Sequence, residues 1–346
     1  MREMAQMTAQ AAPPAKTAPA APHDPSPLQR FLHARESSTF LALVVLFALG
    51  TLLAPGFLGT ANFLTVGQQI AQIGIMAIGV TFVIINAEID LSVGSIYGLG
   101  AVVCGLLMTS DVAWPLAALA GIAAGALAGL LNGLMTVGFG IPSFIVTLGT
   151  LSVYRGVTLL LSGGSPISLS ANDPAVAEFN LLGQGKLFGV LPMQLVIFAL
   201  VAVLGTIVLS RSRYGFNTYA VGGSAEAARL CGISTGRVKV TAFTLSGTLA
   251  GLAGVLGLSF LSYVQGVTGA GMELTAISAV IIGGAALFGG SGTMLGTVIG
   301  VAFIGVLQNI LNLRGISSFW QTVATGAVII LAVAADTWLR RRSGRR

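Results

Sequence analysis

The sequence predicts an all-α, polytopic membrane protein of about ten transmembrane helices that contain an inverted five-helix repeat. Three observations predict this fold class. Hydrophobic residues make up 55% of the 346-residue chain and charged residues only 8%, whereas a soluble domain carries about 25% charged residues. The apolar residues form runs close to the ~20 residues that a bilayer requires. The basic residues gather between these runs, as the positive-inside rule expects.

The two ends of the chain are predicted to be cytoplasmic tails. Residues 1–38 are rich in Ala and Pro and contain no long apolar stretch, so we expect a disordered N-terminal tail. They also lack the apolar segment and small-residue cleavage site of a signal peptide. The transmembrane domain is predicted over 39–339, and residues 340–346 form a basic C-terminal tail.

Ten apolar runs within this domain are predicted to be helices. They are 40–57, 63–86, 91–108, 114–137, 141–161, 190–209, 238–261, 274–288, 294–313 and 319–339. The run 274–288 is short and rich in Gly, so it is the weakest of the ten. An even number of crossings places both tails and the basic loop after the sixth run on one side, which the positive-inside rule makes the cytoplasmic side.

An internal repeat relates the two halves of the domain. Residues 140–147 resemble residues 315–322, and at the same offset Gly121 and Gly125 correspond to Gly296 and Gly300. Five predicted helices separate the copies, and an odd number inverts the second copy in the membrane, as in many transporters. Because Gly and Ser are common in this chain, the alternative is that the recurrence arises by chance.

A polar segment interrupts the apolar sequence between the second and third runs. Ionisable groups at bilayer depth cost ~2.5–3.5 kcal/mol each and usually line a pathway. Carboxylates, amides and hydroxyls are groups that recognise polyols, so this segment is the candidate substrate pathway. Its polar residues are Asn86, Glu88, Asp90, Ser92 and Ser95. The alternative is a short loop in which Asp90 is the N-cap of the third helix.

A second polar segment, 222–233, lies in the basic loop and predicts a short amphipathic surface helix. Ser224 is suited to the N-cap, Glu226 lies in the first turn where the helix dipole favours an anion, and Gly232 is suited to the C-terminal stop. Such a helix either lies on the membrane or docks into another subunit.

Arg155 lies inside the fifth apolar run. A buried Arg needs a partner or a water-filled cavity, and pairing with Glu88 or Asp90 would place it in the pathway. The alternative is that its side chain extends toward the membrane interface near the end of the run.

Several classes of function are not expected. No P-loop motif surrounds any of the three lysines, Lys16, Lys186 and Lys239, so we do not expect this chain to bind ATP through a P-loop, and energy must come from another subunit. Both histidines, His23 and His33, lie in the N-terminal tail, and we expect neither a metal site nor catalytic residues. The pI of about 9.8 does not indicate nucleic-acid binding, because all but three basic residues lie in the tails and the central loop.

Three motifs in order resemble those of a known family. They are DLSVGS at 90–95, GGxxEAARLxGI at 222–233, and ELxAIxA at 273–279 followed by Gly pairs. From about residue 38 to 339 the chain is similar to the permease subunits of ABC importers for sugars such as ribose, xylose and arabinose. Membership implies a multi-pass protein of the bacterial inner membrane that imports carbohydrate without being an enzyme.

The resemblance also implies the partners of such a subunit. They are a cytoplasmic ATP-binding subunit that holds ATP and Mg, a periplasmic sugar-binding protein, and a second permease copy in a homodimer surrounded by lipid. This chain itself would bind no cofactor. The helix at 224–233 would be the coupling helix, and Ser224, Glu226, Arg229 and Gly232 would meet the ATP-binding subunit.

The chain departs from the family at three positions. Ala87 and Glu88 stand where the family usually has small residues such as Gly, and Thr275 stands where it often has Asp. The identity of the sugar therefore remains open. A permease for branched-chain amino acids or nucleosides is one alternative. An ion-coupled secondary transporter, with Glu88 or Asp90 as the titrating group, is another.

Overall fold

Helices form nearly all the regular structure in the computed structural model, which describes residues 35–343. Its ten main helices are α2 (Arg35–Leu53), α3 (Thr60–Ile85), α4 (Val93–Thr109), α5 (Trp114–Gly138), α6 (Ser143–Leu161), α8 (Met193–Arg211), α11 (Thr235–Leu261), α12 (Met272–Ile282), α13 (Met294–Leu313) and α14 (Ser318–Ser343). The connections between them hold α7 (Pro174–Gln184) and α9 (Arg213–Gly223), each as long as α12, and the shorter α10 (Ala225–Leu230).

Two small antiparallel sheets tie connections together. Strand β1 (Ile167–Ser168) pairs with β4 (Tyr263–Val264), with Ile167 opposite Val264. Strand β2 (Lys186–Leu187) pairs with β3 (Leu191–Pro192), with Lys186 opposite Pro192. These pairings order connections of the chain that the sequence predicted only as loops.

The all-α fold is confirmed, and each predicted run overlaps one of the ten main helices. Six helices of the described part are long and apolar enough to cross a membrane, namely α3, α5, α6, α8, α11 and α13. The apolar helices α4 and α12 are shorter. Helix α12 ends at Ile282 instead of residue 288, because Gly284 has a φ of 90° that a helix cannot continue.

The boundary of the predicted tail differs from the structure. Helix α2 begins at Arg35, so residues 35–38 are helical where the sequence suggested a tail. The rest of that predicted tail, and residues 344–346 of the C-terminal one, lie outside the described residues.

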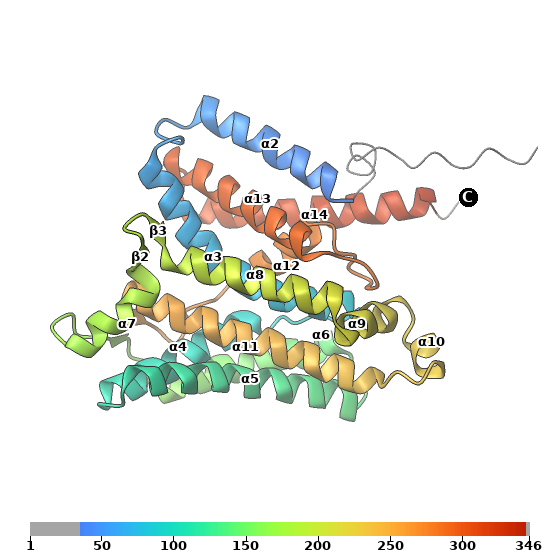
Figure 1. Ribbon diagram of the computed structural model, residues 1–346, viewed down its shortest axis with the longest axis horizontal. Coiled ribbons are helices and arrows are strands. Elements are labelled where there is room, and N and C mark those ends of the chain that lie inside the picture. Colours follow the sequence, from blue (N-terminus) through green and yellow to red (C-terminus); the bar gives the residue numbers. More distant parts are fainter. Residues whose placement is uncertain (1–34, 344–346) are drawn as a thin grey trace, which may run out of the picture. The chain divides into compact units, whose positions relative to one another are not determined.

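The described helices run mostly between two ends of the bundle (Figure 1). Helices α9 and α10 lie at one end, which we call the α10 end, and α7 with β2 and β3 lies at the other, which we call the α7 end. Helix α3 runs toward the α10 end and α11 runs away from it, so the two helices pack antiparallel at the centre of the bundle.

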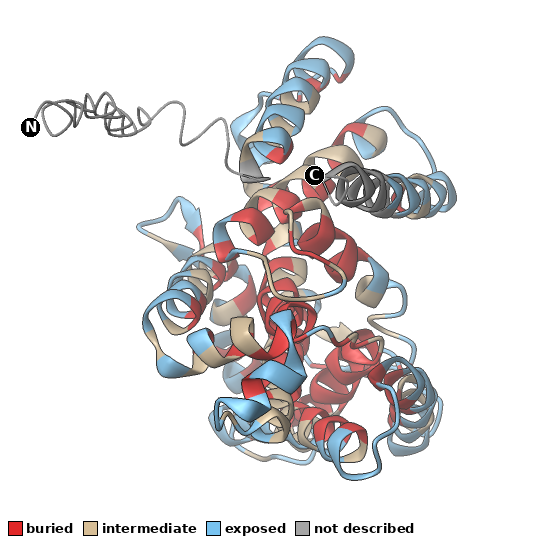
Figure 2. Cartoon of the chain, turned by 90° about the vertical axis from the view of Figure 1, so that its right-hand side faces the viewer, coloured by how far each residue is buried: buried red, intermediate tan, exposed pale blue. Residues whose placement is uncertain are grey.

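The core is built around α3 and α11, which bury larger shares of their residues than the other candidate spans of the described part. Figure 2 shows the buried residues gathered in the interior of the bundle. Helix α11 packs against α3, α4 and α5. Glycines allow the backbones of α5 and α11 to touch: a Cβ on Gly129 would overlap Phe243 O, and a Cβ on Gly125 would overlap Gly247 O. Close backbone approach at small residues is how helices associate in lipid.

The peripheral helices present apolar side chains outward. Leu127 of α5, Phe144 of α6 and Leu200 of α8 are each at least half exposed. A soluble protein does not leave so much contiguous apolar surface in water. The bundle therefore has the surface of a multi-pass membrane protein.

Candidate functional site

The predicted pathway residues gather in one loop that turns back into the bundle. Helix α3 ends at Ile85, Ala87 takes a φ of 61°, and α4 begins only at Val93. The side chains are enclosed: Glu88 is 9% exposed, and Asn86, Asp90, Ser92 and Ser95 are at most 1% exposed. The structure thus brings together all five residues that the sequence singled out.

Asp90 is the centre of this loop, and both of its oxygens are hydrogen-bonded. Its Oδ1 accepts from the Ser92 backbone N at 3.0 Å and from Ser92 Oγ at 2.7 Å. Its Oδ2 accepts from Ser246 Oγ of α11 at 2.9 Å. The prediction of Asp90 as the N-cap of α4 is wrong in detail, because Ser92 occupies the N-cap and Asp90 closes a turn onto it.

The Asp90 network continues through amide and phenol groups. Asn132 Nδ2 of α5 donates to Ser92 Oγ at 2.7 Å, and Tyr154 OH of α6 lies 3.0 Å from Asn132 Oδ1. The same hydroxyl lies 2.9 Å from Ala128 O. The chain of bonds joins α4, α5, α6 and α11 around a buried carboxylate. Satisfied buried networks of this kind make a packing arrangement specific.

Asn86 and Ser95 stand at the margins of that network. Ser95 Oγ donates to Ser92 O at 2.7 Å. Asn86 Nδ2 donates to Phe82 O at 2.9 Å, while its buried Oδ1 has no partner among the described residues. An unsatisfied buried acceptor is costly, by about 1–3 kcal/mol, so this oxygen is available to a further donor.

Glu88 forms an ion pair with Lys239 near the start of α11. The Glu88 side chain is 11% exposed and the Lys239 side chain 25% exposed, so water still reaches the pair. In the sequence, Lys239 counts only among the basic residues of the central loop. No local pattern predicts its pairing with Glu88, which lies 151 residues away. The pair ties the end of α3 to the beginning of α11.

Arg155 pairs with neither Glu88 nor Asp90. Its guanidinium donates to Gly266 O at 3.2 Å and to Thr268 O at 2.6 Å. Both carbonyls belong to the connection between α11 and α12, which runs along α4. Arg155 therefore holds this irregular connection in place by satisfying its backbone acceptors, a need that non-helical backbone has at membrane depth.

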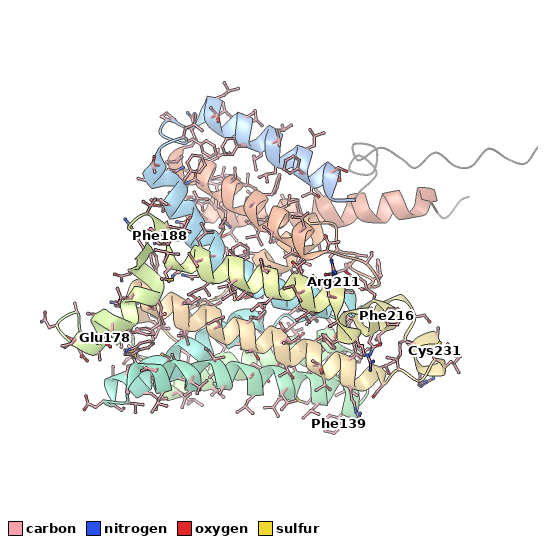
Figure 3. All side chains as sticks on the ribbon, viewed as in Figure 1. Phe139, Glu178, Phe188, Arg211, Phe216 and Cys231 are labelled. Carbon is pink, nitrogen blue, oxygen red and sulfur yellow. The ribbon has the colours of Figure 1, made fainter. Side chains whose placement is uncertain are left out.

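The predicted surface helix forms as α10, and its local signals are confirmed. Ser224 is the N-cap, with its Oγ accepting from Ala227 N at 3.2 Å, and Glu226 lies in the first turn. Gly232, at a φ of 80°, ends the helix. Figure 3 shows Cys231 at the tip of this end, beyond Phe216 and Arg211, with Glu178 and Phe188 at the α7 end.

The segment before α10 is in backbone contact with the end of α3. A Cβ on Gly222 would overlap Ile85 O, and Gly290 N of the α12–α13 connection donates to the same oxygen at 2.9 Å. Tyr214 OH of α9 donates to Val238 O at 3.3 Å, and burial raises the pKa of this phenol, so it stays a donor at neutral pH. Helix α10 is thus anchored on both flanks.

A separate polar site was not predicted. A cavity of about 350 Å³ opens between α3, α11, α13 and α14. Its lining is dominated by amides, and the lining residues are Gln68, Gln69, Gln72, Ile73, Phe260, Leu261, Gln308, Asn312 and Gln321. The signal available in the sequence was the spacing of Gln68 and Gln72, and of Gln308 and Asn312, one helical turn apart within apolar runs.

The described residues contain no group of three or more His, Cys, Asp or Glu side chains that could hold a metal ion. The two cysteines are free, Cys104 being buried and Cys231 exposed. The chemistry of the sites described above rests on hydrogen-bonding groups and on the Glu88–Lys239 pair.

Comparison with known proteins finds permease components of transport systems. Residues 62–333 match the family described as branched-chain amino acid transport system / permease component. The ribose import permease of Bacillus subtilis (strain 168) is 41% identical over 86% of this chain and 91% of its own length. That of Escherichia coli (strain K12) is 38% identical over 87% and 93%, respectively.

A third relative has a different named substrate. The autoinducer 2 import system permease of Enterobacter sp. (strain 638) is 36% identical over 91% of this chain and 90% of its own length. No solved structure matches the chain.

Proposed function

This chain belongs to the branched-chain amino acid transport system / permease component family, and we propose that it is the membrane-spanning subunit of an ATP-driven importer for a monosaccharide or polyol. The observation that carries the proposal is the 41% identity to a ribose import permease, which extends over 86% of this chain. Branched-chain amino acids, which the family description names, are the second candidate substrate.

The bundle crosses the membrane about ten times, as two inverted five-helix halves. Packing supports this: α4 packs on α5 and α6 of its own half and on α11, while α12 packs on α13 and α14 of its own half and on α3, the counterpart of α11 in the first half. The first turns of α4 and α12 also meet, since a Cβ on Gly94 would overlap the Glu273 side chain. Interrupted helices that meet inside the bundle are typical of inverted-repeat transporters.

The α10 end lies in the cytoplasm together with both termini of the chain. Arg211, Arg213, Arg229 and Arg237 cluster there, and basic residues stay on the cytoplasmic side. The α7 end then faces a periplasmic binding protein that delivers the solute. A second copy of the chain completes the permease within the lipid.

Helix α10 couples the permease to a cytoplasmic ATP-binding subunit, which holds ATP and Mg. Ser224 and Gly232 fix where the helix begins and ends, and Glu226 and Arg229 are exposed on it. Motion of α10 reaches the centre of the bundle by two routes. One is the backbone contact of Gly222 with Ile85, and the other is the Lys239–Glu88 ion pair.

The loop after Ile85 borders the substrate pathway. Asn86 and Glu88 form its wall at the α10 end, because the Asn86 oxygen is unpaired and the Glu88 side chain is in reach of water. Asp90, Ser92 and Ser95 hold the loop in shape through the bonds described above. A shift of α3 relative to α11 would move this loop and open the path.

Reconstitution tests the proposal. The chain is purified with the ATP-binding and solute-binding proteins encoded beside it, placed in proteoliposomes, and assayed for ATP-driven uptake of radiolabelled D-ribose and L-leucine. We expect co-purification of an ATP-binding subunit and uptake of ribose. If leucine is taken up and ribose is not, the substrate is an amino acid and the sugar assignment is wrong. If an ion gradient drives uptake without ATP, the proposal of an ATP-driven importer is wrong.

Charge removal at α10 tests coupling in the same assay. Glu226→Gln combined with Arg229→Gln should lower ATP-driven uptake at least about tenfold, because the exposed charges meet the ATP-binding subunit. Thr206→Val, an exposed hydroxyl-to-methyl change on α8 outside α10, is the control. Normal uptake by the α10 variant would contradict the coupling role.

A further inference from the structure

We propose that the amide-lined cavity between α3, α11, α13 and α14 is a transit site that binds a neutral, polyhydroxylated solute. This inference rests on the proposed import function and adds to it the place and the chemistry of recognition. Its volume of about 350 Å³ is at the lower end of the ~300–1,000 Å³ of small-molecule sites. A cavity of this size fits one sugar ring.

The cavity reaches into the bundle from the α7 end. It is bordered there by the ends of α11 and α13 and the start of α14. At 1.5 Å per residue, Gln68 and Gln72 lie roughly 12–18 Å along α3 from its first residue. Amides at this depth face either the bundle interior or water, since lipid tails offer them no hydrogen bonds. The cavity is therefore a wet inlet that continues toward the centre of the bundle.

Most of the lining amides are free to bind a ligand. Within the described residues, no hydrogen bond engages the side chains of Gln68, Gln69, Gln308 or Asn312. An amide offers two N–H donors and a carbonyl acceptor. A hydroxyl likewise both donates and accepts, so adjacent hydroxyls on a ring match such a lining without the need for charge.

Gln72 and Gln321 are held by hydrogen bonds, and Gln321 Nε2 donates to Ile316 O at 3.1 Å. Tyr97 OH donates to Gln72 Oε1 at 2.8 Å, and Gln72 Nε2 lies 3.4 Å from Gln194 Oε1. Gln194 in turn donates to Leu256 O at 3.1 Å. A fixed amide at the inner side of the cavity loses little conformational entropy when it binds a solute.

The composition of the lining selects among solutes. None of the lining residues is Lys, Arg, Asp or Glu, so a zwitterionic amino acid would lose the hydration of its two charges without a charged partner. Phe260 and Ile73 supply apolar surface that suits the C–H groups of a sugar ring. The cavity thus favours a sugar or polyol over a branched-chain amino acid.

Thiol protection tests binding independently of transport. The purified permease–ATPase complex carries Cys231→Ser, so that only buried Cys104 of the natural thiols remains, and Gln308→Cys is added. The rate of modification by a charged methanethiosulfonate is measured with D-ribose, with myo-inositol and with L-leucine. Ala171→Cys, at an exposed position of the α7 end outside the cavity, is the matched control.

We expect D-ribose or myo-inositol to slow modification at residue 308 at least about threefold with no effect at residue 171. Absence of protection by both polyols, or equal protection by leucine, overturns the cavity proposal. The uptake assay tests the function separately: ATP-driven ribose uptake without protection refutes only the cavity. Protection by ribose without any ribose uptake refutes the proposed function and leaves the cavity standing.

Discussion

The Asp90 network and the amide cavity are both polar regions inside an apolar bundle, yet their hydrogen bonds are arranged in opposite ways. Around Asp90, both carboxylate oxygens and the Ser92 hydroxyl have protein partners. In the cavity, the amides of Gln68 and Gln308 have none within the described residues. The first region holds helices together, and the second has its bonding capacity left for a solute.

The difference between the two regions gives a criterion that separates structural from functional polar residues in a membrane protein. Polarity at bilayer depth marks both regions as candidate functional sites, because every polar group there costs free energy without a partner. The difference is whether the partner comes from the protein. A substitution in the network should therefore cost stability, and one in the cavity should cost transport.

The largest effect is expected at Asp90. Asp90→Ala leaves the donors of Ser92 and Ser246 without an acceptor in the core, which we expect to cost about 2–3 kcal/mol of stability. The measurement is the temperature at which buried Cys104 becomes reactive to a thiol-specific fluorophore, in a Cys231→Ser background.

Asp111→Asn is the control for this variant. Asp111 is exposed in a turn with a φ of 60°, a conformation that Asn also adopts readily. An unfolding midpoint for Asp90→Ala equal to that of the control would show that the network does not stabilise the bundle.

Tyr154→Phe should have a smaller effect of the same kind. It removes only a hydroxyl and leaves Asn132 Oδ1 and Ala128 O with one fewer donor, so about 1 kcal/mol is expected. The Cys104 reactivity assay applies again. Tyr263→Phe, whose hydroxyl accepts a hydrogen bond from the exposed Gln265 side chain, should leave the midpoint unchanged. Equal midpoints for the two variants would remove Tyr154 from the network.

Much of this architecture could be predicted from the sequence. Ten apolar runs located the ten main helices, and Ser224, Glu226 and Gly232 located α10, because these signals are local. The long-range partners of Asp90, Glu88 and Arg155 could not be predicted. They come from α11 and from the α11–α12 connection, far away in sequence, and depend on how the helices pack.

Lys239→Met should separate stability from coupling. A partly exposed ion pair contributes at most about 1 kcal/mol, and Met retains the length and apolar stem of the side chain. We expect a small shift in the Cys104 midpoint but a clear loss of ATP-driven uptake, because the pair is one of the two links from α10 to the end of α3. If neither the Cys104 midpoint nor the uptake changes, the ion pair does not couple α10 to the end of α3, and the contact of Gly222 with Ile85 does so alone.

The smallest effect on stability is expected in the cavity. Gln68→Leu removes an amide that has no hydrogen-bond partner within the described residues. The free energy of unfolding should therefore stay within about 0.5 kcal/mol of wild type, with little change in the Cys104 midpoint temperature. Thr65→Val, an exposed hydroxyl-to-methyl change on the same helix outside the cavity, is the matched control. A shift as large as that of Tyr154→Phe would show that Gln68 is structural.

The most direct test of this contrast is ATP-driven D-ribose uptake by the importer carrying Gln68→Leu and Gln308→Leu together, compared at equal amounts of folded protein. We expect uptake to fall at least about tenfold, since two solute hydrogen bonds of about 1 kcal/mol each are lost, with an unchanged Cys104 midpoint. Uptake within about twofold of wild type, or a fall matched by a lower midpoint, would contradict this prediction.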